Sequence, residues 1–455
     1  MIYLLIFYLD ESPNSSRCSD GMKRIAPSIV TDVFLPTLDV YSDLSLIFGW
    51  LFGGHWKYAI SMSIPVLLQF LFTIQKWIRL EKPESKKWSW LLLLLQCWPQ
   101  WRAVRVMNLN FKNDRKFEEK KKELMMEVTS TEPYLEAWPS IIIMTVIMVY
   151  AMDGRNNPDP SQEFCEMHPE NRQCAVFGGF GGSPWFFTTY SISVITGSLG
   201  ITKFLQVGPF SVLSNEGTLS GICRWRFILA YLAVMLSIVT KGLLIGIFIS
   251  VTTSSYVVQE ILGIPNGTQS VIAMTALLFG FFMIPNLIFA FGSIASSTGI
   301  NKKFIKIIAN YPAAWMLPIA TYFVIGSRKM PCCSKDKRQK NELVFSKKFS
   351  AINMTLTVLI YAAFISFFYT PRSTGQYANR PLNPYSDELL YAYFIPVLML
   401  SLTFNIIFLL LDEKCCCSRS RKCFCSSCCG SNCFQHDIYC IDTKNDNLAI
   451  VKIEN

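Results

Sequence analysis

Apolar stretches of about 20 residues recur along this chain between residues 26 and 411, separated by polar connections. Each is long enough to cross the roughly 30 Å hydrocarbon core of a bilayer as a helix. The pattern predicts an all-α polytopic membrane protein with about eight transmembrane helices. We place them at 26–53, 57–78, 133–151, 184–207, 226–250, 270–296, 349–369 and 389–411.

Two further apolar segments contain prolines and are predicted to be broken. The segment 88–108 runs from five leucines into Cys97-Trp98-Pro99, and the segment 307–326 contains Pro312 and Pro318. Proline removes a backbone hydrogen bond, so a broken helix survives at membrane depth only where protein or water covers the freed groups. We therefore expect two re-entrant half-helices that enter and leave on the same side.

The distribution of basic residues supports this topology. With both broken segments re-entrant, the loops on one side contain 23 Lys and Arg residues, whereas the opposite loops contain 4. The positive-inside rule assigns the basic side, and with it both termini, to the cytosol. Only 16% of all residues are charged and 51% are hydrophobic, which excludes a disordered chain or a soluble enzyme. The net charge of +10 is thus attributed to membrane orientation, and no nucleic-acid partner is expected.

The order of spans and broken segments repeats once. Each half reads span, span, broken segment, span, span, which predicts two parallel pseudo-repeats with a functional cavity between them. The resulting organisation is a cytosolic N-terminus at 1–25, a first repeat at 26–207, a cytosolic linker at 208–225, a second repeat at 226–411 and a cysteine-rich cytosolic tail at 412–455.

Cysteines occur on both predicted sides of the membrane. Cys165 and Cys174 lie in the largest extracellular loop, where they are expected to form a disulfide, although two free thiols are the alternative. Asn266 begins an Asn-Gly-Thr glycosylation sequon in another outside loop. In the tail, Cys415, Cys416 and Cys417 stand beside basic residues and are candidates for palmitoylation. Zinc binding at the later tail cysteines is a weaker alternative, and no metal site is predicted.

Charged residues inside apolar spans are costly, so each is a functional candidate. Asp32, Asp39 and Asp43 fall within about 20° of one face of the first helix. Glu132 and Glu136 share a face at the start of the span 133–151. Four basic side chains are candidates to oppose these acids: Lys203, Lys241, Arg102 and Arg105. Two interpretations stay open, namely buried ion pairs that hold the bundle together and a hydrated groove that faces lipid headgroups.

Motifs for enzyme chemistry are missing from the sequence. There is no phosphate-binding loop of the Gly-x-x-x-x-Gly-Lys-Ser/Thr type, no His-Glu-x-x-His and no Gly-x-Ser-x-Gly, and the chain has 3 histidines. We therefore expect neither an enzyme nor a cofactor, and no ATP-driven transport.

Several short motifs resemble those of the XK family, the XK-related phospholipid scramblases. The strongest is Glu132-x-x-x-Glu136-Ala137-Trp138-Pro139, similar to that family's Glu-x-x-x-Glu-Ser-Ala-Pro-Gln signature, from which Trp138 and Ser140 depart. The others are Asp39-Val40-Tyr41-Ser42-Asp43, Leu94-Leu95-Gln96 followed by Trp101-Arg102, and Arg224-Trp225-Arg226. The resemblance spans residues 30 to 410, and the departures leave the subfamily open.

The resemblance implies a fold of eight spans and two half-helices that exchanges phospholipids between leaflets without ATP. In caspase-activated members this exposes phosphatidylserine in apoptosis, at the plasma membrane. By resemblance, Asp39, Asp43, Glu132 and Glu136 line the lipid route. Expected partners are membrane phospholipids and a single-span glycoprotein or a chorein-like lipid-transfer protein, and a homodimer is allowed. Asp442 and Asp446 in the tail do not stand in a convincing caspase tetrapeptide.

Two other functions compete with scrambling. A proton- or cation-coupled transporter, or a channel, would use the same buried acids. A membrane scaffold would use the basic loop 328–348 to dock cytosolic lipid-transfer proteins or anionic lipid. A seven-span receptor is disfavoured, because it needs an outside N-terminus.

Overall fold

The computed structural model of the chain describes the residues 29–81, 86–111, 132–152, 162–168, 171, 173–178, 184–207, 221–254, 317–329, 341–345, 347–369 and 394–410. Nearly all of them are helical, as the predicted all-α class requires. Several predicted features lie outside the described residues: the span 270–296, both terminal regions with Cys415, Cys416 and Cys417, and the sequon at Asn266.

The first half opens with two antiparallel helices. A π-helical turn, η1 (Val30–Phe34), leads directly into α3 (Leu35–Phe52), and α4 (Trp56–Leu80) returns along it. The connecting turn needs a glycine, because Gly54 has φ +80°, in the left-handed region. These helices match the predicted spans 26–53 and 57–78 to within a few residues.

The first broken segment is indeed two helices, α5 (Lys86–Leu94) and α6 (Trp98–Phe111). The sequence pointed to Pro99 as the cause of the break, and this was wrong. Pro99 occupies the first turn of α6, where a proline costs no hydrogen bond. The chain turns instead at Gln96, whose φ of 53° is unusual for a residue other than glycine.

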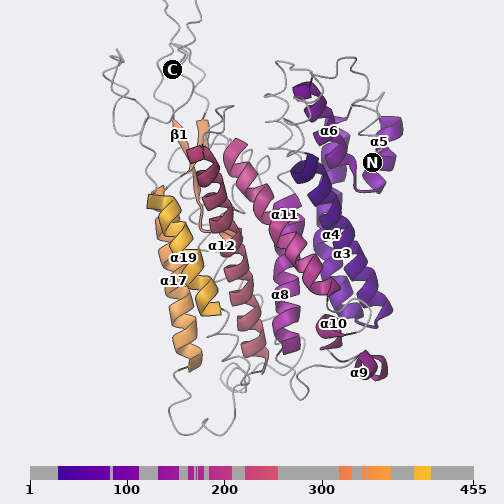
Figure 1. The fold of residues 1–455 in the computed structure, drawn as a ribbon, viewed down its shortest axis with the longest axis vertical. Helices are drawn as coiled ribbons and strands as arrows, with labels where there is room; N and C mark the ends of the chain where they lie inside the picture. Colours follow the sequence, from indigo (N-terminus) through magenta and orange to yellow (C-terminus); the bar gives the residue numbers. More distant parts are fainter. Residues whose placement is uncertain are drawn as a thin grey trace, which may run out of the picture.

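The rest of the first half contains the elements that surround the centre of the bundle. A second π-helical turn, η3 (Pro133–Ala137), leads into α8 (Trp138–Met152), and two short helices, α9 (Gln162–Met167) and α10 (Cys174–Phe177), precede α11 (Trp185–Val207). In Figure 1, α11 runs obliquely between α8 and the pair α3–α4, while α5 and α6 lie at the end of the molecule opposite α9 and α10.

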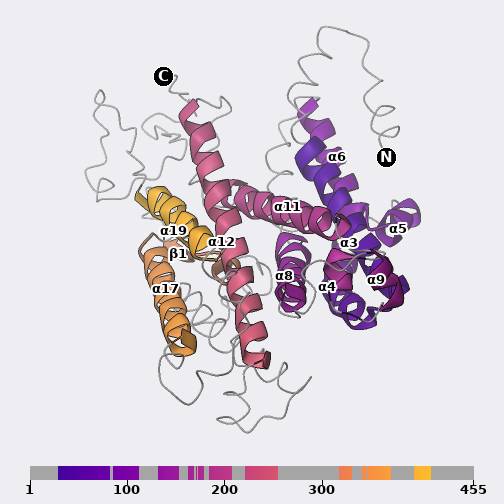
Figure 2. The same ribbon diagram turned by 60° about the horizontal axis from the view of Figure 1, so that its bottom comes forward.

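The second half is built on the long helix α12 (Gly221–Ser254), which packs against α8, α11 and α19 (Ile395–Leu410), while α17 (Lys347–Tyr369) packs on α19. Figure 2 shows α12 between α8 on one side and α17 with α19 on the other. The predicted broken segment 307–326 is described from residue 317, where a helical turn ends at Ala320.

One element was not anticipated from the sequence. β1 (Ile325–Lys329) and β2 (Asn341–Phe345) form an antiparallel two-stranded sheet in which Ile325 is paired with Phe345 and Lys329 with Asn341. The basic segment 328–348, predicted as a loop, therefore begins in a β-hairpin that joins the broken segment to α17.

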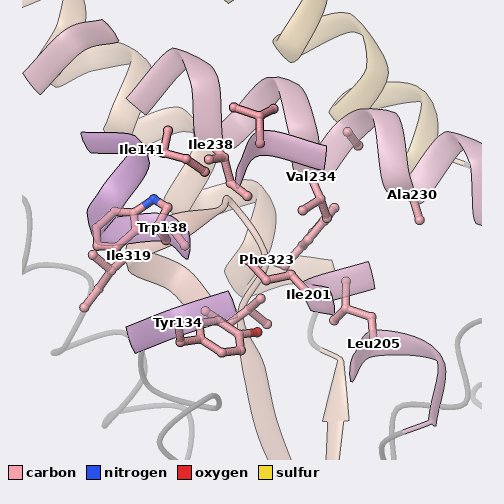
Figure 3. Packing of buried hydrophobic residues seen from close by; sticks show 14 of the residues in the cluster. Tyr134, Trp138, Ile141, Ile201, Leu205, Ala230, Val234, Ile238, Ile319 and Phe323 are labelled. Atoms are coloured by element: carbon pink, nitrogen blue, oxygen red, sulfur yellow. The ribbon is translucent and has the colours of Figure 1, made fainter. Parts of the chain in front are cut away.

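The largest apolar core joins the two halves. Side chains of η3, α8 and α11 interlock there with side chains of α12, α19 and the turn at 317–323. Figure 3 shows Ile141 beside Ile238 of α12 and Trp138 beside Ile319, within the same cluster as Tyr134 and Phe323. A second core fills the opposite end of the first half, between α3, α4, α8, α10 and α11.

Large apolar side chains also cover parts of the outside. Trp56, Ile60, Ile64, Leu67 and Leu71 form an exposed stripe along α4 at spacings of three and four residues. Within the described part of the chain, Trp56–Leu80 and Phe227–Gly246 are long and apolar enough to cross a membrane, and the apolar helices Pro133–Val149 and Ile395–Leu410 are shorter.

Candidate functional site

Four carboxyl groups from two elements meet inside the first half of the bundle. Asp39 and Asp43 are one turn apart on α3, and both side chains are fully buried. Glu132 and Glu136 stand at the start and within η3, and both are buried as well. All four acids were candidates from the sequence, and the structure buries all four side chains. We call Asp39, Asp43, Glu132 and Glu136 the acidic cluster.

A serine from a third helix joins the two aspartates. The hydroxyl oxygen of Ser193 on α11 lies 2.7 Å from Oδ1 of Asp39 and 3.3 Å from Oδ1 of Asp43. Its one proton is the hydrogen-bond donor available to both carboxyl groups. Sequence analysis did not find Ser193, because a serine within an apolar helix resembles any other small residue. Its only signal was that it shares a face with Thr189 and Thr196, which are also buried.

Glycines bring α11 close enough for this contact. A methyl group built on Gly200 would lie 2.2 Å from Cγ of Pro133, and one on Gly197 would lie 3.0 Å from Cβ of Ala137. The backbone of α11 therefore rests directly on η3. Small residues permit such close approaches between helices in a membrane. The two glycines thereby hold Ser193 and the acidic cluster in one layer.

Most carboxyl oxygens of the acidic cluster have no hydrogen-bond partner among the described residues. These atoms are Oδ2 of Asp39 and of Asp43, Oε1 of Glu132 and both oxygens of Glu136. Asp39, Asp43 and Glu132 all act electrostatically on Glu136, so the four groups are close neighbours. Burial of several like charges without partners is costly, which distinguishes the cluster from a structural ion-pair network.

The predicted counter-charges are located elsewhere. Lys203 forms an ion pair with Asp32 of η1 and a hydrogen bond with Thr31, and it reaches Glu132 only electrostatically. Asp32, which the sequence placed on the same helical face as Asp39 and Asp43, lies in the π-helical turn η1 and pairs with Lys203 instead. The structure brings Asp32 and Lys203 together and leaves the cluster without a direct basic partner among the described residues.

Arg102 was predicted to oppose the acidic stripe, and the structure contradicts this. Arg102 lies 3.6 Å from Oε2 of Glu81, at the end of α4. Glu81 also accepts hydrogen bonds from Nε1 of Trp98 at 3.1 Å and from Arg105 at 3.2 Å. Sequence analysis missed Glu81, because it stands among lysines at the end of a predicted span. Its carboxylate anchors α6 to α4.

Lys241 is also not a partner of the acids. Its ammonium group donates to the backbone carbonyl oxygens of Pro318 at 2.8 Å, Ile319 at 3.0 Å and Thr321 at 2.6 Å. Asn353 of α17 donates to the carbonyl oxygen of Tyr322 at 3.3 Å. Carbonyl groups at a helix end carry partial negative charge and lack donors within the helix. The ammonium group of Lys241 supplies hydrogen bonds to these carbonyl groups of the broken segment.

The loop between α8 and α11 has the expected cross-link. Cys165 and Cys174 form a disulfide, and the residues after it pack into the second core. The indole nitrogen of Trp50 on α3 donates to the carbonyl oxygen of Ala175 at 2.9 Å. The disulfide-closed loop is thus attached to the end of α3 beyond Asp43.

The acidic cluster is not arranged as a metal centre. Among the described residues, no group of three or more His, Cys, Asp or Glu side chains has the geometry to hold a metal ion. The carboxyl groups can instead accept hydrogen bonds from a polar group that enters the bundle.

Comparison with known proteins finds no match to this chain among family models, curated proteins or solved structures.

Proposed function

We propose that this chain is an ATP-independent phospholipid scramblase of the XK-related kind, which exchanges lipids, phosphatidylserine among them, between the two leaflets. The observation that carries the proposal is the acidic cluster. Five carboxyl oxygens that have no hydrogen-bond partner within the described part of the chain lie inside a bundle that exposes large apolar side chains along α4.

Lipid exchange has one main physical obstacle, the transfer of a charged headgroup through hydrocarbon. Unpaired polar groups within the bundle can replace part of the hydration that the headgroup loses, while the acyl chains stay in the bilayer. Asp39 and Asp43 accept hydrogen bonds in this scheme. The motifs that resemble those of the XK family also support lipid exchange as the function.

The topology that accompanies this function is eight spans and two re-entrant half-helices, with both termini in the cytosol of a plasma-membrane protein. The interruptions at Gln96 and at 321–322 support the two half-helices. In Figure 1 the first of these hairpins, α5–α6, and strand β1 after the second lie at the same end of the molecule. A single-span glycoprotein or a chorein-like lipid-transfer protein remains a proposed partner.

The test is a leaflet-accessibility assay with purified protein in liposomes that contain fluorescent phosphatidylserine or phosphatidylcholine. A membrane-impermeant reductant is added outside, without ATP. We expect bleaching well beyond half of the signal. The Asp39→Asn/Asp43→Asn protein should bleach the inner-leaflet signal about tenfold more slowly, which corresponds to about 1.4 kcal/mol in barrier height.

A matched control is Glu163→Gln, which neutralises an exposed acid on α9, away from the acidic cluster. It should scramble at the rate of the unaltered protein. Bleaching that stops near half with the unaltered protein would reject scrambling. If the aspartate variant then lost proton or cation uptake while lipid asymmetry was unchanged, the transporter would be the correct reading.

A further inference from the structure

The residues around Glu81 form a positively charged site apart from the acidic cluster. The side chain of Glu81 is 1% exposed, and its carboxylate is shared by two guanidinium groups, Arg102 at 3.6 Å and Arg105 at 3.2 Å. Among the described residues, this one carboxylate stands against two guanidinium groups, and the guanidinium of Arg105 is the more exposed of the two.

Arg105 presents this charge at the surface. Its side chain is 45% exposed, and its guanidinium carbon lies 5.5 Å from the ring centroid of Trp101. A guanidinium has five N–H donors, and Nη1 of Arg105 is the atom bound to Glu81. Among the described residues, no other acceptor contacts Arg105. Glu81 and Trp101 therefore hold a planar set of donors that faces outward.

The helix that precedes this site has the side chains of a membrane interface. On α5, Trp88, Trp90, Leu91 and Leu94 are exposed, and so is Leu95 in the turn that follows. Trp is enriched where the headgroups meet the acyl chains, and leucines beside it enter the hydrocarbon. Because α5 packs against α6, Arg105 stands near the level at which lipid phosphates lie.

The same hairpin contacts the helix that carries the aspartates. The hydroxyl group of Tyr41 on α3 donates to the carbonyl oxygen of Leu95 at 3.2 Å, and it lies 3.7 Å from the sulfur of Cys97. Tyr41 is located between Asp39 and Asp43 in the sequence. Tyr41 is exposed, whereas Asp39 and Asp43 are buried, so the turn between α5 and α6 contacts the outer face of the helix that carries the two aspartates.

We propose that Arg105, supported by Arg102, binds the phosphate group of a phospholipid at the membrane surface, beside the α5–α6 hairpin that packs on α3. A guanidinium fork fits two phosphate oxygens at once, and the flanking tryptophans fit the boundary of the acyl chains. The choice of a lipid, rather than a free phosphate, rests on the proposed scrambling function. Its chemical requirement is a phosphate monoanion attached to a glycerolipid.

Binding can be measured without scrambling, by calorimetric titration of the full-length protein in detergent. The probes are dihexanoylphosphatidylserine, dihexanoylphosphatidylcholine, dihexanoylglycerol and inorganic phosphate. We expect both phospholipids to bind and dihexanoylglycerol, which lacks the phosphate, to bind much more weakly. The Arg105→Gln protein should bind the phospholipids about tenfold more weakly, as expected for loss of charge-assisted hydrogen bonds.

The control is Lys57→Gln at the opposite end of α4. Lys57 also lies over a tryptophan, with Nζ 5.6 Å from the ring centroid of Trp56, so the variant removes a similar cation–aromatic pair. It should leave phospholipid affinity unchanged. Arg105→Lys keeps the positive charge beside Glu81 and so preserves the fold, but it lacks the planar fork and should bind several times more weakly than arginine.

Two results would overturn the proposal. One is equal affinity of the unaltered protein and both Arg105 variants for the phospholipids. The other is binding of inorganic phosphate as tight as that of the phospholipids, which would assign the site to a free phosphate. The Asp39→Asn/Asp43→Asn protein should still bind the phospholipids, so failure of scrambling and failure of this site can be told apart.

Discussion

The ammonium group of Lys241 lies 2.6 Å from the carbonyl oxygen of Thr321, at the point where the broken segment of the second half turns toward β1. The ring of Tyr322 covers the same ammonium group, with its centroid 5.2 Å away. A single side chain of α12 thus supplies the donors that the end of this helical turn would otherwise lack.

Replacement of this lysine should destabilise the protein. Lys241→Met keeps the length of the side chain but removes the donor from the carbonyls of Pro318, Ile319 and Thr321. A buried group without a partner costs about 1–3 kcal/mol, so we expect a loss of at least about 3 kcal/mol. The measurement is the thermal unfolding midpoint in detergent, with Lys57→Met as the control. Equal midpoints for Lys241→Met and the unaltered protein would contradict this role.

The contact between α11 and η3 should tolerate no side chain at Gly200. In the Gly200→Ala protein, the new methyl group meets Cγ of Pro133, and we expect a loss of about 1–3 kcal/mol from the forced shift. Gly242→Ala is the graded comparison, since its methyl group would lie 3.3 Å from Oγ1 of Thr145. The Gly200→Ala/Pro133→Ala double variant should regain part of the loss, and strict additivity in this cycle would refute the clash.

Ser193 should matter for the acidic cluster in a way that its neighbour does not. Ser193→Ala removes the one donor that Asp39 and Asp43 share, and we expect the free energy of unfolding to fall by about 1–3 kcal/mol. Ser191→Ala is the matched control, because Ser191 is exposed and bonds only to the carbonyl oxygen of Phe187 in its own helix. The unfolding midpoints of the two variants should differ clearly. Similar midpoints would show that the hydrogen bonds from Ser193 to Asp39 and Asp43 do not stabilise the protein.

The disulfide between Cys165 and Cys174 should stabilise the protein through its short loop. Closing a loop with a sequence separation of 9 is worth about 2.5 kcal/mol in the chain-entropy description. Addition of a reductant should therefore lower the thermal midpoint of the unaltered protein. The Cys165→Ser/Cys174→Ser protein should start at the lower midpoint and ignore the reductant. A reductant effect of the same size in that variant would locate the sensitive cysteine elsewhere.

Helix positions and buried acids were the features that the sequence predicted well. Apolar length located α3, α4, α8, α11, α12, α17 and α19, because a membrane-length helix leaves an unbroken signal. The spacing of Asp39, Asp43, Glu132 and Glu136 predicted their shared faces for the same reason, since side-chain direction follows from the helical period. The π-helical turns η1 and η3 were not predicted, yet all four acids are buried.

Partners across the bundle were harder to predict, and here the sequence analysis was wrong. Lys241 and Arg102 were matched to acids by charge alone. Lys241 instead binds backbone carbonyls, an acceptor that no sequence letter marks, and Arg102 binds Glu81, which the topology count treated as part of a loop. The break in the segment 88–108 was predicted, but its cause was assigned to Pro99 and not to Gln96, since a proline can also stand in the first turn of a helix.

The glycines of α12 allow its backbone to pack directly against α8. A methyl group on Gly246 would lie 3.2 Å from the carbonyl oxygen of Thr145 and 3.1 Å from a methyl group of Val149, so the two backbones are in contact. No methylene chain fits in that seam while α8 and α12 keep this packing. In the proposed scrambling, the acyl chains of a lipid whose headgroup reaches Asp39 therefore stay outside the seam between α8 and α12.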